Sequence, residues 1–92
     1  MSYRIVLLDK AKSDIKKLQK SGEKKLLTKL ENLLVEISKN PRFGTGKPEQ
    51  LKHYEKETWS RRLNDKNRLV YEIHDDIIQV DMLNIMGHYD DK

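Results

Sequence analysis

The stretch LLTKLENLLVEI, residues 26–37, decides the fold of this 92-residue chain. Its leucines and the closing Ile37 recur at i, i+1, i+4, i+7, i+8 and i+11, the spacing of one apolar helix face. The opposite face is rich in lysine. The pattern therefore predicts an amphipathic helix that ends at Asn40-Pro41, because proline disfavours a helical residue before it.

The residues before this helix predict a strand and a second helix. Residues 3–8 are short, apolar and rich in β-branched side chains, which favours a strand. Asp9 is a plausible N-cap, and Ser21-Gly22 ends the helix because glycine adopts the left-handed cap conformation easily. Two helices joined by so tight a turn form an antiparallel hairpin. The apolar positions of the first helix are Ala11, Ile15 and Leu18.

After Pro41 the helical spacing gives way to loops and alternating segments. Strands linked by hairpins after a pair of helices are typical of an α+β fold. We expect one domain over residues 1–92: an N-terminal strand and a helical hairpin packed on one face of a mostly antiparallel sheet of four or five strands. The later segments are a Gly-rich loop at 42–47, a weak strand from Leu51, a polar loop at 54–58, strands at 59–63, 68–74 and 77–85, and turns at 64–67 and 75–76.

Alternation along the strands predicts which residues share a face. Leu69, Tyr71 and Ile73 form an apolar set that would pack under the leucines of the second helix. Arg68 belongs to the opposite set, with Val70, Glu72 and His74. In the preceding strand Arg62 falls on the side away from Arg61, so Arg62 and Arg68 are the expected pair on the helix-free face.

Composition limits the possible functions. The net charge is +4, with residues 1–46 carrying +6, residues 47–68 carrying +3 and residues 69–92 carrying −5. A basic body attracts phosphate chains, so nucleic acid is the first partner to consider, although lysines on helices often serve only to solvate a surface. Without a membrane-length apolar run or any cysteine, we expect a cytoplasmic protein with no membrane contact.

Several common sites are not supported by the sequence. The loop from Phe43 to Lys47 is not a phosphate-binding loop, because Pro41 and Pro48 occupy positions where glycine and a hydroxyl residue are needed. We expect no metal site, since the three histidines lack ligand spacing, and no cofactor. Covalent catalysis is poorly supported, because the sequence has neither a cysteine nor a Gly-x-Ser-x-Gly elbow.

Polar residues of the C-terminal half can together support RNA cleavage. A carboxylate such as Glu49 can take the 2′-hydroxyl proton, arginine can stabilise the phosphorane charge, and a histidine such as His88 can protonate the leaving 5′-oxygen. Each residue also has an ordinary reading, as a solvated loop carboxylate, an edge-strand charge or a surface histidine. The polar set comprises Glu49, Lys52, His53, Arg61, Arg62, Arg68 and His88-Tyr89.

The motifs GTGKPEQLKH at 44–53, WSRR at 59–62, RLVY at 68–71 and the pair His88-Tyr89 resemble the YoeB/Txe toxins of the RelE-type toxin–antitoxin superfamily. The resemblance covers most of the chain. It implies a RelE-like fold and a ribosome-dependent endoribonuclease that cuts messenger RNA without metal.

The resemblance also implies roles for individual residues. The general base falls on Glu49, the phosphate-stabilising arginine on Arg68 and the general acid on His88, while Tyr89 helps to shape the pocket. The chain departs from the family in about two extra residues before His88 and in Asp90-Asp91-Lys92 after Tyr89. The expected RNA-binding residues are Lys47, Lys52, Arg61 and Arg62.

The implied partners are a cognate YefM/Axe-like antitoxin, the ribosome with its mRNA, a second copy in a homodimer, and operator DNA only as the toxin–antitoxin complex. Two other functions remain open at this stage. A non-catalytic nucleic-acid-binding module would bind RNA or DNA without cleaving it. A degenerate interaction domain would only sequester the antitoxin.

Overall fold

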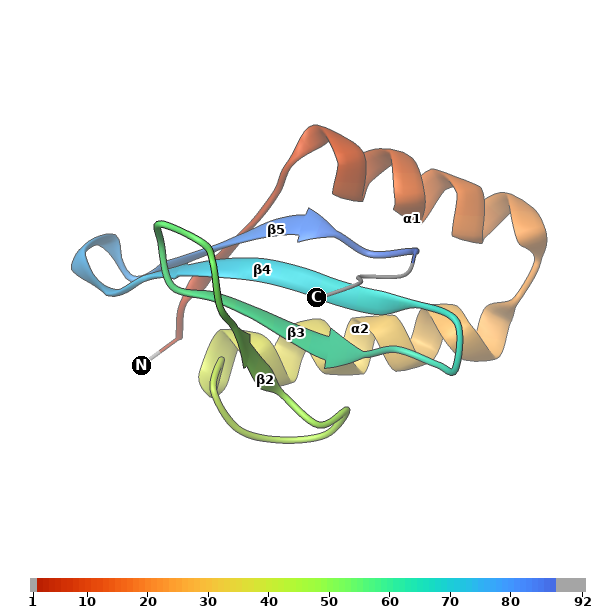
Figure 1. Cartoon of the computed structure of the whole chain (residues 1–92). Coiled ribbons are helices and arrows are strands. Elements are labelled where there is room, and N and C mark those ends of the chain that lie inside the picture. Colours follow the sequence, from red (N-terminus) through yellow and green to blue (C-terminus); the bar gives the residue numbers. More distant parts are fainter. Residues whose placement is uncertain (1, 88–92) are drawn as a thin grey trace.

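The computed structural model describes residues 2–87 and contains two helices and a five-stranded sheet (Figure 1). This is the predicted α+β fold. The elements in chain order are β1 (Arg4–Leu7), α1 (Asp9–Ser21), α2 (Lys24–Lys39), β2 (Glu49–Leu51), β3 (Thr58–Arg62), β4 (Arg68–His74), a short 3-10 helix (Asp75–Ile77) and β5 (Gln79–Asn84).

The sheet has the order β1-β5-β4-β3-β2, so β5 lies between the first strand and the hairpins (Figure 1). β1 pairs with β5 in parallel, with Arg4 opposite Gln79, whereas every other pairing is antiparallel. Both helices lie on one face of the sheet. The predicted mostly antiparallel sheet with a one-sided helical hairpin is therefore confirmed.

The core lies between the helices and the sheet, as the leucine spacing predicts. Leu33 and Ile37 of α2 and Leu18 of α1 are completely or almost completely buried, and they belong to one cluster with the sheet residues. At about 25 cal/mol per Å² of apolar surface, such burial is the main stabilising contribution in a chain this small. The predicted apolar set of β4, Leu69, Tyr71 and Ile73, lies in this cluster.

Local details differ from the sequence prediction at three places. The N-cap of α1 is Leu8 rather than Asp9, and no side chain caps this helix. The weak strand ends at Leu51 instead of beginning there. Residues 75–77 form a 3-10 helix, so the last strand begins at Gln79. Gly22 adopts φ +77°, which confirms the predicted end of the first helix.

Within residues 2–87, neither helix combines the length and the apolar character that a membrane crossing requires.

Candidate functional site

The helix-free face of the sheet carries the polar residues singled out by sequence motifs. Register aligns Glu49 of β2 with Ser60 of β3, and Ser60 with Val70 of β4. Arg62 lies opposite Arg68 on the same two strands. Because paired residues point to the same face and alternate residues share it, Glu49, Arg62 and Arg68 all project away from the helices.

Arg68 reaches across to the neighbouring strand. Its Nη1 lies 3.4 Å from Oγ of Ser60, which is the register partner of Glu49. Arg68 is half-buried, whereas Glu49 is exposed. The guanidinium is therefore directed toward the strand that borders the carboxylate, and both groups face solvent where a phosphate chain can lie.

A tight loop delivers Glu49 to this face. The N–H of Arg62 donates to the carbonyl of Gly46 at 2.6 Å, which joins the loop to β3. A Cβ on Gly46 would lie 2.6 Å from the Arg62 carbonyl oxygen, and its φ of +88° also favours glycine. Lys47 follows with φ +52° and an exposed side chain, and Lys52 is exposed just after β2.

Arg61 does not belong to this surface, which corrects the expectation that it binds RNA. Its side chain is completely buried on the helix side of the sheet. Nη2 donates to the carbonyls of Asn40, Pro41 and Phe43 at 3.1, 3.3 and 2.9 Å, and Nε lies 3.3 Å from the Tyr71 hydroxyl. Arg61 therefore holds the end of α2 and the loop that follows it.

Glu36 of α2 completes the attachment of this loop. Its Oε1 accepts from the Thr45 amide at 2.8 Å and from Nη1 of Arg61 at 3.2 Å. The hydrogen bond from Thr45, with help from the Arg61 charge, holds the pKa of Glu36 below its ordinary value. The loop leading to Lys47 and Glu49 is thus held by Glu36 of α2 on one side and by the Arg62 amide of β3 on the other.

A buried carboxylate anchors the end of the sheet. Oδ2 of Asp14 accepts from the amides of Ile85 and Met86 at 3.1 and 3.0 Å, and Lys10 binds the same carboxylate at 2.7 Å. Burial alone would raise the pKa of Asp14, but the bonds from Lys10 and the two amides outweigh it and lower the pKa. Helix α1 therefore fixes the segment that follows β5.

That segment returns to Arg68. The Arg68 amide donates to the Gly87 carbonyl at 3.2 Å, and the Gly87 amide donates to Oδ1 of Asn67 at 2.9 Å. Asn84 adds a bond from Nδ2 to the Arg68 carbonyl at 3.1 Å. The two other predicted site residues, His88 and Tyr89, lie outside the described residues.

The structure also assembles a group that the sequence analysis did not anticipate. Glu72, His74 and Asp81 each present a potential metal-ligand atom, and these atoms lie within 4.8 Å of one another. Spacing along the sequence does not reveal this group, because Asp81 reaches Glu72 only through the register of β4 with β5. The available signal was Glu72-x-His74, which puts both side chains on one face of a strand.

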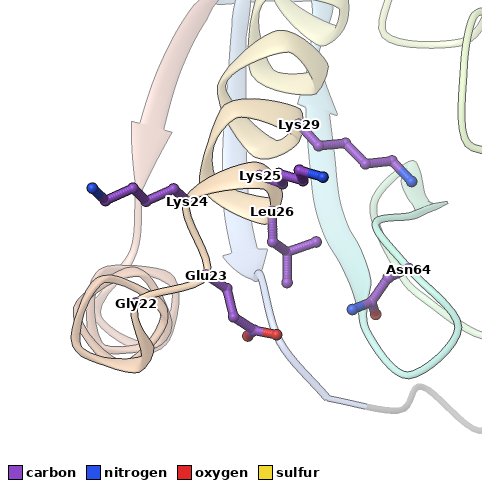
Figure 2. Close-up of a pocket in the computed structure, with 7 residues that line it drawn as sticks. All are labelled: Gly22, Glu23, Lys24, Lys25, Leu26, Lys29 and Asn64. Carbon is purple, nitrogen blue, oxygen red and sulfur yellow. The ribbon is translucent and has the colours of Figure 1, made fainter.

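A separate cavity of about 510 Å³ opens at the turn end of the helices (Figure 2). Glu49, Arg62 and Arg68 do not line it. Its cationic side chains belong to the first turns of α2, where the sequence predicts a lysine-rich face. The lining residues are Gly22, Glu23, Lys24, Lys25, Leu26, Lys29 and Asn64.

Two positioning residues escaped the sequence analysis. Asp14 is spaced three residues after Ala11 and four before Leu18, so a helical projection puts it on the buried face, and a buried carboxylate requires partners. Ser60 shares its strand face with Arg62, which alternation alone can recognise. Both contact other residues of the fold: Asp14 accepts from the amides of Ile85 and Met86, and Ser60 contacts Arg68.

Comparison with known proteins assigns most of the chain to one group. Residues 9–89 match the family model of the YoeB-like toxin of bacterial type II toxin–antitoxin systems. The chain is 39% identical over 69 residues to Toxin RelK of Mycobacterium tuberculosis, which covers 75% of this chain and 79% of that protein. It is 38% identical over 58 residues to Toxin YoeB of Escherichia coli, covering 63% of this chain and 69% of that protein.

Solved structures agree with these matches. The YoeB dimer from Staphylococcus aureus is 33% identical and superposes with a TM-score of 0.82. The match covers 97% of this chain and 100% of the S. aureus chain. The YoeB–YefM complex from the same organism has a TM-score of 0.78 at 33% identity and the same coverage. The E. coli toxin RelE, at 22% identity and a TM-score of 0.71 over 95% of this chain and 84% of its own, shares the fold.

Proposed function

Because this chain belongs to the YoeB-like toxins of bacterial type II toxin–antitoxin systems, we propose that it is a ribosome-dependent mRNA endoribonuclease. The observation that carries this proposal is the arrangement of Glu49, Arg62 and Arg68 on one open face. There the guanidinium of Arg68 bonds to the register partner of the carboxylate. Such a face presents a base and two cations to one RNA backbone.

Cleavage begins with removal of a proton. Glu49 takes the proton of a ribose 2′-hydroxyl, whose oxygen then attacks the adjacent phosphorus. The exposure of Glu49 and the hydrogen bond that joins the preceding loop to β3 at Gly46 support this role, because a general base must be accessible and held in position. No metal ion is required at the scissile phosphate in this scheme.

Arginine then stabilises the charge that develops. Arg68, supported by Arg62, binds the phosphorane oxygens. The bond to the 5′-oxygen breaks as His88 supplies a proton to it, which leaves a 2′,3′-cyclic phosphate and a 5′-hydroxyl. The Gly87 carbonyl accepts from the Arg68 amide, and His88 is the next residue in the sequence, which supports its assignment as the acid. Tyr89 shapes the pocket.

Exposed cations supply affinity for RNA. Lys47 and Lys52 flank Glu49 and are exposed, so both can contact phosphates beside the reacting group. Nine further lysines lie on α1 and α2, which cover the opposite face of the sheet. Positive charge on both sides of the chain supports contact with more RNA than the cleaved strand, as the ribosome offers.

The proposal includes control by a partner. We infer that a YefM/Axe-like antitoxin binds the toxin, that the toxin forms a homodimer, and that only the complex binds operator DNA. Cleavage of mRNA would take place in the cytoplasm. The YoeB dimer and the YoeB–YefM complex of S. aureus support the first two inferences.

The test is cleavage mapping in cells. We would induce the wild type, Glu49→Gln and Glu55→Gln briefly and map mRNA 5′ ends by primer extension. Glu55 is a matched control, because it is also an exposed acid, in the loop after β2. We expect cuts from the wild type and Glu55→Gln, and a loss of at least about a hundredfold from Glu49→Gln.

Two outcomes would count against the proposal. If soluble, folded wild type produces no cuts and no growth defect, the chain is an antitoxin-sequestering domain. If it binds RNA with a steep salt dependence but Glu49→Gln changes nothing, it is a non-catalytic binding module.

A further inference from the structure

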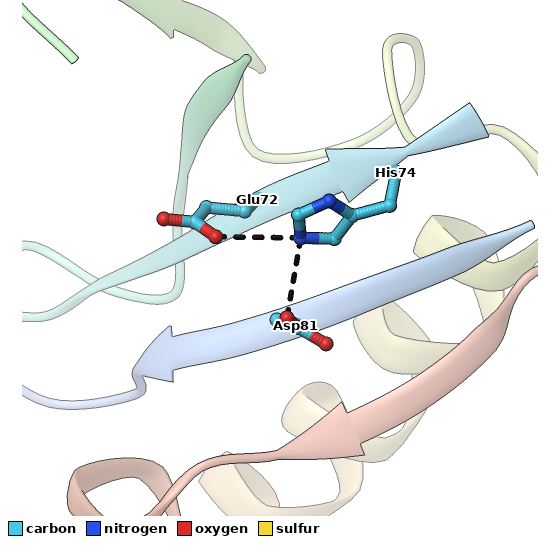
Figure 3. A group of neighbouring side chains, drawn as sticks. All are labelled: Glu72, His74 and Asp81. Carbon is cyan, nitrogen blue, oxygen red and sulfur yellow. Dashed lines mark ion pairs between the residues drawn. The ribbon is translucent and has the colours of Figure 1, made fainter. Parts of the chain in front are cut away.

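Glu72, His74 and Asp81 converge on the helix-free face between β4 and β5 (Figure 3). Glu72 and His74 are alternate residues of β4, and Asp81 is the register partner of Glu72 on β5. Nε2 of His74 lies 3.3 Å from Oε1 of Glu72 and 3.2 Å from Oδ2 of Asp81. Each side chain is about four-fifths buried, with exposed fractions of 23%, 17% and 20%.

The imidazole nitrogen has no hydrogen-bond partner among residues 2–87, although its atom is buried. Both carboxylate oxygens are near it, but Nε2 points between them rather than at either one (Figure 3). A buried polar atom normally has a hydrogen-bond partner, so the lack of one at Nε2 needs an explanation. A cation seated between the three groups would satisfy the nitrogen lone pair and both oxygens together.

Charge at the cluster leads to the same conclusion. Neither Glu72 nor Asp81 pairs with a lysine or arginine within residues 2–87, even though the chain is basic overall. Gln79 donates from Nε2 to Oδ1 of Asp81 at 2.7 Å, which orients the carboxylate and leaves Oδ2 directed at His74. Such a bond from outside the ligand set is common around metal-binding carboxylates.

We propose that Glu72, His74 and Asp81 bind a divalent transition-metal ion, zinc in particular. Zinc accepts imidazole nitrogen and carboxylate oxygen at about 2.0–2.2 Å, and ligands of a tetrahedral ion with such bonds stand about 3.3 Å apart. The distances from Nε2 to the Glu72 and Asp81 oxygens match this separation between ligand atoms. Three protein ligands leave a position for water or another donor.

This site is separate from the proposed cleavage residues. Glu72 lies four residues beyond Arg68 on the same strand, which corresponds to roughly 13 Å. A bound divalent ion would neutralise two carboxylates on the face that we assign to RNA, and it would cross-link β4 to β5. Metal binding at this cluster does not depend on whether the chain cleaves RNA.

The test measures metal binding directly. The full chain, stripped with a chelator, would be titrated with Zn²⁺ by calorimetry and with Co²⁺ by visible absorption. We expect one ion per chain, Co²⁺ absorption typical of low coordination number, and a midpoint of thermal unfolding that rises by several degrees with excess Zn²⁺. Asp81→Asn, which retains the carbonyl that Gln79 binds, should weaken Zn²⁺ binding at least tenfold.

His53→Asn is the matched control. His53 is exposed, has φ +72° that asparagine tolerates, and lies outside the cluster. It should leave Zn²⁺ affinity unchanged, whereas His74→Ala should abolish binding in a chain whose circular dichroism shows it folded. Failure of the wild type to bind Zn²⁺ or Co²⁺, or undiminished binding by folded Asp81→Asn and His74→Ala, would overturn the proposal.

Discussion

Arg61 and Arg62 are adjacent in the sequence and lie on opposite faces of the sheet. Arg61 has 0% exposure and five hydrogen bonds to loop carbonyls, Glu36 and Tyr71. Arg62 is exposed beside the candidate site. One strand thus supplies two identical side chains, one buried where it holds the fold and the other exposed on the helix-free face. Chemical type alone therefore says little about role, and the strand face decides it.

The largest effect on stability is expected when each of these two arginines is replaced by alanine. Arg61→Ala removes all five hydrogen bonds that the buried guanidinium makes, and should lower the free energy of unfolding by about 3–5 kcal/mol. Arg62→Ala should change it by no more than about 0.5 kcal/mol. Urea unfolding of both variants measures the two values. Equal stabilities would mean that Arg61 is not a structural clamp.

On the helix-free face, Arg68→Ala should reduce mRNA cleavage by roughly 10²–10³-fold, because a preorganised donor to the transition state is lost. Lys66→Ala is the control, since Lys66 is an exposed cation in the turn just before β4. Single-turnover cleavage on programmed ribosomes measures the effect. A loss of the same size in Lys66→Ala would indicate a general charge effect and no special role for Arg68.

On the helix side of the sheet, the fold can also be destabilised at the buried carboxylate of Asp14. Asp14→Asn removes the charge from a buried carboxylate that accepts several hydrogen bonds. It should lower the free energy of unfolding by about 2 kcal/mol at pH 7. The folded-state pKa of Asp14 is lowered, so its contribution is present above the unfolded pKa of about 3.9 and is lost as pH falls through the folded value. The wild type and Asp14→Asn should therefore converge in stability at acid pH. A constant difference from pH 7 to pH 2 would contradict this.

The smallest effect is expected for a third arginine, Arg42, which is only partly buried. Nε of Arg42 lies 2.7 Å from Oε2 of Glu57, and both side chains are about 30% exposed. The hydrogen bond from Arg42 lowers the pKa of Glu57, yet solvent weakens such pairs. A double-mutant cycle with Arg42→Ala and Glu57→Ala should give a coupling of about 1 kcal/mol that falls with added salt. A coupling energy as large as the Arg61→Ala effect would contradict the view that burial determines how much an arginine contributes to stability.

Sequence reasoning predicted the elements and faces that depend on local spacing. The leucines at 26–37, the glycine at 22 and the alternation along β4 each report a single strand or helix, so one stretch of sequence is sufficient. It also identified Arg62 and Arg68 as a pair, because turn length and alternation determine hairpin register.

What could not be predicted depends on contacts across the fold. The burial of Arg61 requires knowing that the loop after α2 folds over that strand, and Asp14 meets Ile85 through a separation of 71 residues. The cluster of Glu72, His74 and Asp81 likewise needs the β4–β5 register. Such pairings are determined by the packing of helices on the sheet, which no short motif records.

The parallel pairing of β1 with β5 has a consequence for synthesis. Arg4 has no strand partner until Gln79 exists, and β5 also supplies the neighbour of β4. During synthesis β2, β3 and β4 can pair with one another before β5 exists, whereas β1 must wait for it. Closing so long a loop is entropically slow, so we expect β1 to join the sheet last.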